Sequence, residues 1–439
     1  MRFFDRTTEI NHLKEIREQS NNSSRFTVIT GRRRIGKTTL VLNAYKEEEI
    51  IYLFVSRGSE SELCREFIEE IKRKLDVNIL GNVERFVDLF DFLMQESKKR
   101  PITLMIDEFQ NFKRVNSAIF SQMQKVWDLN KENSKLNLIV CGSVFSLMNQ
   151  LFKNSKEALY GRQTDFIRVM PFNVSVLKEI LSIYNTNYTN EDLLALYMFS
   201  GGVAKYVEIL MDSGCTTKEK MINKIFSKDS YFLSEGKNML IEEFGRDYGR
   251  YFEILTLIAS GHNTRSQIED ILKSEVAGYL TRLENDYALI SKIRPMFETS
   301  VNKNTHYLIE DNFLNFWFRF MYKYNYMLEI EAYDKLKTVF KRDYNTYSGK
   351  VLEKYFKALL KQSNTYTRLG GWWDRKSENE IDIIAEDELS QSATFFEVKR
   401  KKEEIDLNIL KHKSEHFLTK TGRFNDYTLT YKGLSMEDM

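Results

Sequence analysis

Nine residues from Gly31 to Thr39 have the types and spacing needed to bind a phosphate chain. They read Gly-Arg-Arg-Arg-Ile-Gly-Lys-Thr-Thr and contain the pattern GxxxxGK[ST]. The glycines allow a tight loop whose backbone N–H groups face inward, while Lys37 reaches the terminal phosphates and the Thr38 hydroxyl binds Mg²⁺. The remaining residues assigned to nucleotide binding in this loop are Arg32, Arg33, Arg34, Ile35, Gly36 and Thr39.

Two further polar sites follow apolar segments. Residues 101–106 (PITLMI) lead into Asp107 and Glu108, and residues 136–141 (LNLIVC) lead into Gly142 and Ser143. We expect Asp107 to bind Mg²⁺ through water and Glu108 to polarise the attacking water. Ser143 is predicted to sense the γ-phosphate from the neighbouring strand end. An ordinary strand-to-helix turn is the alternative for Ser143.

The elements that must position these residues alternate between strand and helix. Residues 25–30, 101–106 and 136–141 read as buried strands, and helical periodicity covers residues 39–45, 84–94 and 118–129. Such βαβ alternation predicts an α/β fold with a parallel sheet. The carboxyl ends of the strands would then carry the phosphate chemistry.

Several segments together resemble the archaeal and bacterial ATPase family related to AAA+ and STAND NTPases. They are FFDRTTEI, TGRRRIGKTT, LMIDEFQ, IVCGS, LYGRQTDFIRVMPF and SGGVAKYVEIL, within roughly the first 330 residues. The resemblance implies ATP as the nucleotide, Phe4 and Arg6 near the adenine, and Arg162 contacting the γ-phosphate. Arg162 has an equal alternative, pairing with an acid. One departure is in the segment Gly201–Tyr206, where Ala204 stands in place of the proline usual in the family. The rigid sensor geometry that this proline gives to family members is therefore not expected here.

The middle of the chain has helical periodicity. Short helices at residues 174–227 resemble the lid of AAA+-like proteins, and residues 251–309 follow the winged-helix order of three helices and two strands. Five residues there could contact DNA: Tyr279, Thr281, Arg282, Lys292 and Arg294. Because the third helix has few basic residues, a packing role between domains is favoured over DNA contact.

Carboxylates reappear near the end of the chain. Predicted strands at residues 380–385 (EIDIIA) and 393–398 (ATFFEV) carry Asp382 and Glu397, with Lys399 directly after. These residues, with Glu353 on a predicted helix over residues 349–360, fall where the PD-(D/E)xK nuclease superfamily has its active site. Asp382 and Glu397 could share one or two divalent metals while Lys399 orients or activates the attacking water. The Lys399–Lys402 run could hold a nucleic-acid backbone or simply be solvated.

Composition limits the function classes. The 439 residues include 65 Lys and Arg against 63 Asp and Glu, so a uniformly basic nucleic-acid surface is excluded. With 42% hydrophobic residues the chain is not disordered, and it has no apolar run of membrane-spanning length. Three cysteines without a CxxC pair argue against disulfides and structural zinc. We therefore predict a cytoplasmic protein with no membrane partner.

Four domains are predicted. They are a P-loop ATPase core (residues 1–172), a helical lid (173–245), a winged-helix module (246–325) and a small restriction-endonuclease-like α/β domain (326–439). The leading hypothesis is an ATPase, using ATP and Mg²⁺, that gates a metal-dependent nuclease acting on nucleic acid, with DNA as the expected substrate. One alternative is a STAND-like switch whose last domain only binds; another is a ring-forming motor. A homo-oligomer or a partner protein is compatible with each.

Overall fold

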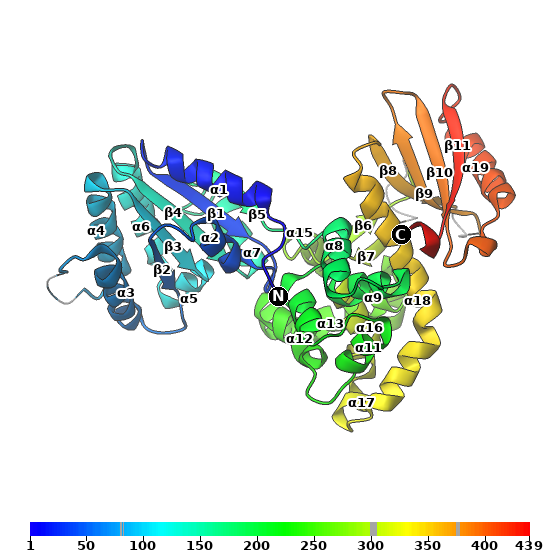
Figure 1. Cartoon of the computed structure of the whole chain (residues 1–439), viewed down its shortest axis with the longest axis horizontal. Coiled ribbons are helices and arrows are strands. Elements are labelled where there is room, and N and C mark those ends of the chain that lie inside the picture. Colours follow the sequence, from blue (N-terminus) through cyan, green and yellow to red (C-terminus); the bar gives the residue numbers. More distant parts are fainter. Residues whose placement is uncertain (80, 82, 299–304, 375–377) are drawn as a thin grey trace. The chain divides into compact units, whose positions relative to one another are not determined.

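The computed structural model describes residues 1–79, 81, 83–298, 305–374 and 378–439. It has two compact units, of which the first comprises residues 5–170 and the second residues 1–4 with 171–439 (Figure 1). The three subdivisions predicted beyond residue 172 all lie inside the second unit and remain predictions. Within the described ranges, no helix combines the length and apolar character needed to cross a bilayer.

The first unit is built on a five-stranded sheet in the order β2-β3-β4-β1-β5, in which every pairing is parallel. This agrees with the α/β fold predicted from the alternation of elements. Its strands are β1 (Arg25–Thr30), β2 (Ile50–Phe54), β3 (Ile102–Asp107), β4 (Leu136–Gly142) and β5 (Asp165–Arg168). Its helices are α1 (Thr7–Gln19), α2 (Lys37–Ala44), α3 (Glu60–Leu75), α4 (Phe86–Lys99), α5 (Phe112–Val115), α6 (Ala118–Asn130) and α7 (Phe145–Lys153).

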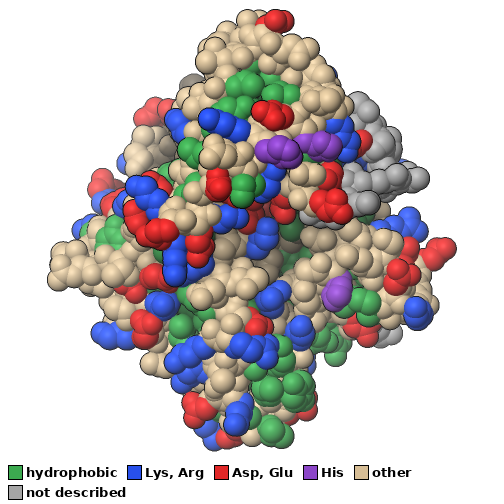
Figure 2. Space-filling view, turned by 90° about the vertical axis from the view of Figure 1, so that its right-hand side faces the viewer, with side chains coloured by type: hydrophobic (Ala, Val, Ile, Leu, Met, Phe, Trp, Pro, Cys, Tyr) green, Lys and Arg blue, Asp and Glu red, His purple; other side chains and the backbone are tan. Residues whose placement is uncertain are grey.

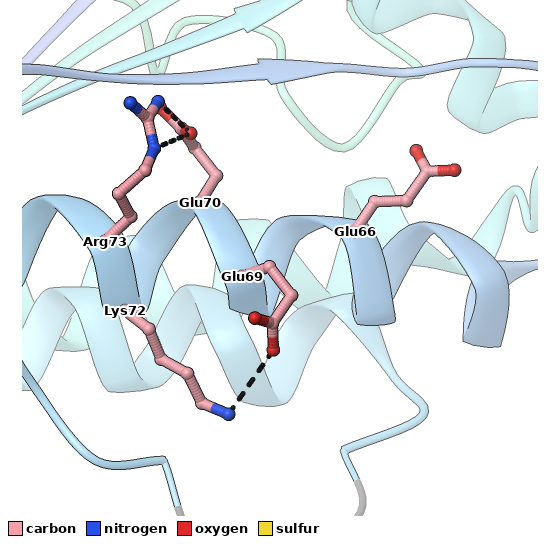
Figure 3. A pocket seen from close by; sticks show the side chains of 5 residues that line it. All are labelled: Glu66, Glu69, Glu70, Lys72 and Arg73. Carbon is pink, nitrogen blue, oxygen red and sulfur yellow. Dashed lines mark hydrogen bonds and ion pairs between the residues drawn. The ribbon is translucent and has the colours of Figure 1, made fainter.

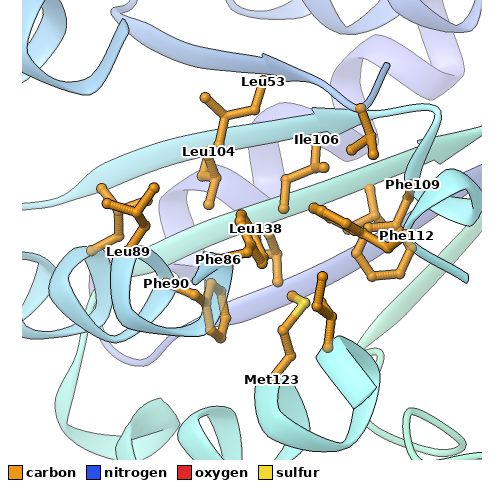
Figure 4. Close-up of a cluster of buried hydrophobic side chains, with 14 of the residues drawn as sticks. Leu53, Phe86, Leu89, Phe90, Leu104, Ile106, Phe109, Phe112, Met123 and Leu138 are labelled. Atoms are coloured by element: carbon orange, nitrogen blue, oxygen red, sulfur yellow. The ribbon is translucent and has the colours of Figure 1, made fainter. Parts of the chain in front are cut away.

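The core of this unit explains why its strands read as continuous apolar runs. Strand β3 is buried along its whole length, because successive side chains point to opposite faces and both faces are covered. Leu104 and Ile106 contribute to one large apolar cluster, together with Phe86 and Phe90 of α4 and Met123 of α6 (Figure 4). Helices α4 and α6 thus close one face of the sheet.

The strand register brings the predicted polar residues to one edge of the sheet. Thr30, the last residue of β1, pairs with Gly142, and Ile106 in β3 pairs with Val140 of β4. Gly31, Ser143 and Asp107 therefore follow neighbouring strands at nearly the same level. In an open α/β sheet this carboxyl edge is where ligands bind.

The second unit begins with helices. They are α8 (Val174–Tyr184), α9 (Asn190–Ser200), α10 (Ala204–Asp212), α11 (Lys218–Ile225) and α12 (Tyr231–Phe244). Helix α9 starts with a capping box in which Thr189 and Asp192 bond each other's backbone N–H groups. Nearly every residue of α9 is buried, so it forms the centre of this helical group.

Three helices and a hairpin follow in the order expected from the sequence. They are α13 (Tyr248–Ala259), α14 (Arg265–Leu272), α15 (Ala277–Asn285), β6 (Ile290–Ile293) and β7 (His306–Ile309). The two strands are antiparallel, with Ile290 opposite Ile309. Residues 299–304, between these strands, lie outside the described residues. Helices α16 (Asn312–Phe320) and α17 (Asn325–Glu329) lead on to α18 (Tyr333–Gln362).

The C-terminal sheet has four strands in the order β11-β10-β9-β8. Strands β8 and β9 are antiparallel, as are β9 and β10, whereas β10 and β11 are parallel. Helix α19 packs on this sheet, and Trp372, Phe395 and Phe417 contribute to the core between them. The elements are β8 (Arg368–Trp373), β9 (Glu380–Asp387), β10 (Ser392–Val398), α19 (Leu407–Thr421) and β11 (Thr428–Leu434).

Two predicted segments differ from the structure. The helix predicted over residues 349–360 is the second half of the 30-residue α18, which begins at Tyr333. The helix predicted over residues 84–94 begins at Phe86 and continues to Lys99. In addition, β11 follows α19 as a fourth strand that the pattern of the sequence did not indicate.

Candidate functional site

The phosphate-binding loop lies between the end of β1 and the start of α2. Gly31 and Gly36 have φ angles of +154° and +93°, which favour glycine. Gly31 also lacks room for a side chain, because a Cβ there would lie 2.7 Å from the carbonyl oxygen of Val169. Helix α2 begins at Lys37, so its unpaired N–H groups stand at the loop, where anions bind.

Lys37 is buried at the centre of this loop. Its Nζ donates hydrogen bonds of 3.0 Å to the Gly31 carbonyl and 3.1 Å to the Arg32 carbonyl. Burial lowers the pKa of Lys37 from its ordinary value, and the carboxylates of Glu108 and Asp107 oppose that effect. A triphosphate would give this ammonium anionic partners in place of neutral carbonyls.

Thr38 and Asp107 supply oxygen donors of the kind that Mg²⁺ prefers. The Thr38 hydroxyl donates to Asp107 Oδ2 at 2.6 Å, and the Tyr52 hydroxyl donates to the same oxygen at 3.2 Å. Burial and the Asp107 carboxylate raise the pKa of Tyr52. Because hydroxyl and carboxylate oxygens meet here beside a phosphate-binding loop, these residues fit a magnesium ion.

Glu108 is held by two neighbours. Its Oε2 accepts a hydrogen bond of 2.7 Å from the Ser143 hydroxyl and a second of 2.5 Å from Gln110 Nε2. Glu108 adopts a left-handed backbone conformation with φ of +52°, which is uncommon for a residue with a side chain. Ser143, predicted as a γ-phosphate sensor, therefore contacts the predicted water-polarising carboxylate.

Arg162 lies near the amino-terminal ends of the strands, whereas the phosphate-binding loop of the same chain lies at their carboxyl ends. Arg162 precedes β5, whose first residue Asp165 pairs with Thr27 near the start of β1. Its guanidinium forms a 3.2 Å ion pair with Asp128. At about 3.3 Å per residue, the length of β1 separates Arg162 from Gly31 by on the order of 15 Å. Arg162 is thus paired with an acid, as the alternative expects, and does not lie beside the loop of its own chain.

The other residues predicted to bind the nucleotide lie in different parts of the chain. Arg6 is buried, and its Nη2 donates to the Met170 carbonyl at 2.6 Å. Phe4 belongs to the second unit, where the Arg2 guanidinium lies 4.8 Å from its ring centroid. Within the loop, Arg32, Arg33 and Arg34 are half-buried, Ile35 is buried and Thr39 is exposed.

A second group of polar residues lies where β9 and β10 meet. Phe396 pairs with Ile383, so the antiparallel register places Asp382 across from Glu397. Asp382 Oδ2 accepts the backbone N–H of Val398 at 2.7 Å. Glu397 is buried, and its Oε2 has no hydrogen-bond partner among the described residues. A buried, unpartnered carboxylate oxygen is costly unless a cation binds it.

Lysines surround Glu397 and the neighbouring carboxylate Glu353. Lys399 Nζ lies 3.3 Å and Lys413 Nζ 3.8 Å from Glu397 Oε1, while Lys350 Nζ lies 3.0 Å from Glu353 Oε1. Lys350 Nζ also lies 3.6 Å from Glu380. The sequence therefore placed Lys399 beside Glu397 correctly but gave no sign of the other two lysines.

Electrostatics at this group follow from burial. Burial raises the pKa values of Glu353 and Asp382, and the Lys350 ammonium opposes the shift at both. Lys357 lies four residues after Glu353 on α18. Burial lowers the pKa of Lys357, and the carboxylates of Glu353 and Asp382 oppose this shift. Glycine at position 371 suits the close approach of β9, because a Cβ there would lie 3.1 Å from the Asp382 carbonyl oxygen.

The donor set at β9 and β10 limits what metal it could hold. Across the described ranges, no three His, Cys, Asp or Glu side chains come together in a geometry that could hold a metal ion. The facing pair Asp382 and Glu397 offers carboxylate oxygens of which one is unpartnered. Two carboxylates with lysines alongside fit one divalent ion that keeps several of its waters, as Mg²⁺ does.

The residues predicted to contact DNA from the winged-helix segment have local partners. The Tyr279 ring packs 5.1 Å from that of Tyr251, and the nearby Tyr251 phenol raises the pKa of Arg282. Thr281 Oγ1 donates to the Ala277 carbonyl at 2.9 Å. In the wing, Lys292 lies 3.3 Å from Glu284, and Arg294 is exposed. These contacts all lie within residues 251–292, so four of the five side chains are engaged locally.

One surface depression lies apart from the predicted site residues. A shallow depression on α3 is lined by five charged residues, among which Lys72 pairs with Glu69 and Arg73 with Glu70 (Figure 3). Figure 2 shows Lys and Arg side chains interspersed with Asp and Glu on one face of the molecule. A contact with nucleic acid on such a surface depends on a local cluster of cations.

Site residues that were not predicted from the sequence include Tyr52, Gln110 and Lys413, and two of them, Tyr52 and Lys413, act through long-range contacts. Tyr52 lies in β2, and its hydroxyl reaches Asp107 in the adjacent strand. Gln110 stands two residues after Glu108 in the Asp-Glu-Phe-Gln segment, and this closeness in sequence could have indicated its contact with Glu108. Lys413 reaches Glu397 from α19 across the fold of the C-terminal sheet. Nothing in local sequence distinguishes Lys413 from the other lysines of that helix.

Comparison with known proteins identifies two regions. Residues 3–210 match a family described as an ATPase domain predominantly from Archaea. Residues 317–416 match a family described as archaeal and bacterial proteins of unknown function. The chain is also 30% identical, over 411 residues, to the uncharacterized protein MJECL04 of Methanocaldococcus jannaschii, which covers 91% of this chain and 88% of that protein.

One solved structure shares the fold of this chain, and a second is similar over much of its length. The Walker-type ATPase paby2304 of Pyrococcus abyssi superposes with a TM-score of 0.54 at 22% identity, covering 72% of this chain and 96% of that one. The Orc2 protein of Aeropyrum pernix, solved as ADPNP and ADP complexes, has a TM-score of 0.49 at 14% identity, covering 76% and 94%. From the matched ATPase region and the near full-length relative, the chain belongs to the family of P-loop ATPases found predominantly in Archaea.

Proposed function

We propose that this protein hydrolyses ATP in its P-loop unit and that the nucleotide cycle controls a metal-dependent nuclease centre at β9 and β10. The observation that carries the first half is the hydrogen bond from Thr38 to Asp107, which joins the loop to the carboxyl end of β3. The observation that carries the second is the buried, unpartnered Glu397 Oε2 facing Asp382 and adjacent to Lys399.

In ATP hydrolysis, each residue of the first site has one task. Lys37 and the N–H groups of the loop bind the β- and γ-phosphates, and Thr38 with Asp107 would hold Mg²⁺. Magnesium, when bound, neutralises the charge that develops on the phosphates. Glu108 orients the attacking water, and the hydrogen bonds from Ser143 and Gln110 fix the direction of its carboxylate.

In phosphodiester cleavage, Asp382 and Glu397 would hold a divalent ion such as Mg²⁺, which supplies Lewis acidity when bound. Lys399 stands 3.3 Å from Glu397, where its ammonium can orient the attacking water and balance the phosphate charge. Exposed Lys401 and Lys402 follow directly and offer cations to a DNA backbone. Binding and cleavage of DNA are thus assigned to the C-terminal sheet.

A cleavage assay tests this proposal. Linear duplex and single-stranded DNA are incubated with Mg²⁺ or Mn²⁺, with and without ATP, using wild type, Asp382→Asn and Lys37→Ala. We expect cutting to be lost in Asp382→Asn and the ATP response to be lost in Lys37→Ala. Glu388→Gln is the matched control, because Glu388 follows the same strand but is exposed.

The outcomes separate the two halves. If Asp382→Asn cuts as wild type does, Asp382 is not part of a nuclease centre and the second half fails. Failure of the wild-type protein to cut under any condition, with ATP hydrolysis retained, also removes the second half and leaves the ATPase. An unchanged ATP response in Lys37→Ala would reject control by the nucleotide.

A second function is favoured by one specific observation. Lys399 and Lys413 already pair with Glu397, as Lys350 pairs with Glu353, so ammonium groups compensate these carboxylates without a metal. Under this proposal the protein is an ATP-dependent switch, and the C-terminal sheet binds nucleic acid or protein without cutting. Calorimetric titration with Mn²⁺ discriminates between the two functions. A heat of binding that is present in wild type and absent in Asp382→Asn supports the metal centre. Absence of a heat of binding in wild type supports the switch.

Two further features belong to the proposal. Because Arg162 is remote from the loop of its own chain, it is assigned to the nucleotide site of a neighbouring copy in a homo-oligomer. A cytoplasmic location is supported by Cys64, Cys141 and Cys215, which are all free and buried thiols. Both assignments are independent of the nuclease chemistry.

A further inference from the structure

The residue after Lys399 is bound to a helix of the region matched as an ATPase domain. Arg400 Nη2 forms an ion pair with Glu191 Oε1 of α9, and Arg400 Nη1 donates to Ser348 Oγ of α18 at 2.6 Å. The guanidinium also lies 5.2 Å from the ring centroid of Tyr344. The Arg400 side chain is 18% exposed, so these contacts largely exclude water.

Glu191 also has partners besides Arg400. Its second oxygen accepts the Tyr344 hydroxyl at 2.6 Å and lies 3.6 Å from Lys218 Nζ. Glu191 stands in the first turn of α9, beside the capping box that fixes the start of that helix. A carboxylate at a helix N-terminus is further stabilised by the helix dipole. The Glu191–Arg400 pair is therefore anchored at both ends.

Further contacts join the same two parts of the chain. The backbone N–H of Lys399 donates to the Leu434 carbonyl at 3.0 Å, which ties the end of β10 to β11. Directly beyond β11, the Met436 carbonyl accepts Asn190 Nδ2 at 2.6 Å. Lys178 of α8 donates to the Met439 carbonyl at 3.1 Å. Helices α8 and α9 thus hold both the strand end that carries Lys399 and its neighbour.

The pair spans the two regions that the comparisons identify separately. Glu191 lies within residues 3–210, matched as an ATPase domain, and Arg400 within residues 317–416, matched as a family of unknown function. The two residues are 209 positions apart in sequence. Partly buried charges of opposite sign at such a junction are costly to separate, because each would be left without its partner.

We propose that Glu191 and Arg400 are positioning residues, through which helix α9 sets the place of Lys399 in the centre at β9 and β10. This rests on the proposed nuclease function and adds the route by which the ATPase region acts on it. The bonds of Arg400 to Glu191 and Ser348 fix the backbone directly after Lys399. Because catalysis is sensitive to displacements of about 1 Å, release of Arg400 misplaces Lys399.

A double-mutant cycle tests the pair. Glu191→Gln, Arg400→Gln and the double variant are compared in DNA cleavage, in ATP hydrolysis and in amide hydrogen exchange over residues 396–402. We expect each single variant to lose about tenfold or more in the cleavage kcat, with little change in KM and in ATP hydrolysis. Exchange over residues 396–402 should rise in each. The double variant should be no worse than the worse single one, because both remove the same contact.

Two variants keep the test decisive if Arg400→Gln folds poorly. Tyr344→Phe removes only the hydroxyl bonded to Glu191 and should give a smaller change in the same direction. Glu219→Gln is the matched control, since Glu219 is an exposed acid that also pairs with Lys218. Independent, multiplicative losses in the double variant, or unchanged exchange over residues 396–402 in all of them, would overturn the inference.

The two proposals can fail separately. If wild type does not cut DNA at all, the nuclease proposal fails, whereas the exchange measurement still decides whether Glu191 positions the segment after Lys399. If wild type cuts DNA and the single variants cut equally well, the nuclease stands and the positioning role is rejected.

Discussion

The backbone N–H of Met296, in the segment after β6, donates a 2.8 Å hydrogen bond to the carbonyl oxygen of Gly371 in β8. The Met296 side chain is 6% exposed and packs in the same apolar cluster as Trp372 and Phe395. Close by, the His306 ring of β7 stacks on Trp373 with centroids 4.8 Å apart. The pair of strands β6 and β7, with the segment after β6, therefore completes the core of the C-terminal sheet.

Met296→Ala should destabilise the protein by about 2–5 kcal/mol, the cost of removing a large buried side chain and leaving a cavity. Denaturant unfolding followed by tryptophan fluorescence measures the change, since Trp372 lies in the same cluster. Leu389→Ala is the control, because Leu389 is 90% exposed and should cost less than about 0.5 kcal/mol. Equal stability of the two variants would show that Met296 is not a core residue.

Glu108→Gln should retain ATP binding and slow hydrolysis by roughly 100- to 10,000-fold, the usual contribution of a residue that activates water. Ser143→Ala and Gln110→Ala should each have a smaller effect on kcat, because they act by holding the Glu108 carboxylate. Single-turnover hydrolysis and binding of a fluorescent nucleotide separate the two steps. Wild-type turnover by Glu108→Gln would remove Glu108 from the mechanism.

Arg162→Ala should lower hydrolysis by about a thousandfold if the residue completes a neighbour's site, as arginine fingers do. Mixing inactive Arg162→Ala with inactive Lys37→Ala should then restore about a quarter of wild-type activity, because some interfaces combine an intact loop with an intact arginine. Steady-state hydrolysis of the mixture, with light scattering for oligomers, makes the measurement. Asp128→Asn, which frees Arg162 from its ion pair, should not abolish activity. No activity in any mixture would argue against action between copies.

Buried thiols should make the fold sensitive to alkali. Burial raises the pKa of Cys64 to about 12 and raises that of Cys141 as well. In the unfolded chain a thiol ionises near pH 8.5, so the unfolded state loses protons first and the free energy of unfolding falls as pH rises above that value. Each such thiol costs up to about 1.4 kcal/mol per pH unit between its unfolded and folded pKa values.

Urea unfolding between pH 7 and 10 measures this loss. Cys64→Ala should show a shallower fall above about pH 8.5 than wild type, although its stability at pH 7 is lower because a buried side chain is truncated. Parallel slopes for the two proteins would contradict a raised Cys64 pKa.

The parts of the phosphate-binding site that could be predicted are those whose residues lie close together in the sequence. Gly31, Gly36, Lys37 and Thr38 are required together in one turn, so their spacing alone predicted both the loop and the strand and helix around it. The partner of Arg162 could not be predicted in this way, because Asp128 is 34 positions away on another element.

Packing decided the segments that the sequence pattern missed. Strand β11 alternates between exposed and half-buried residues, which gives little apolar signal. It also contains Gly433, where a Cβ would lie 2.5 Å from the Ile405 side chain. A glycine in a strand normally weakens the prediction of a strand, yet here it permits the close approach of another segment. Helix α18 was predicted too short, although residues of both its halves, Phe340 and Tyr355, pack against rings of α9.

The bond from Arg6 to the Met170 carbonyl places the two ends of residues 5–170 side by side. A unit whose first and last residues are adjacent can be inserted into another chain, or removed from it, without stretching either backbone. The same adjacency makes residues 5–170 a natural starting point for circular permutation.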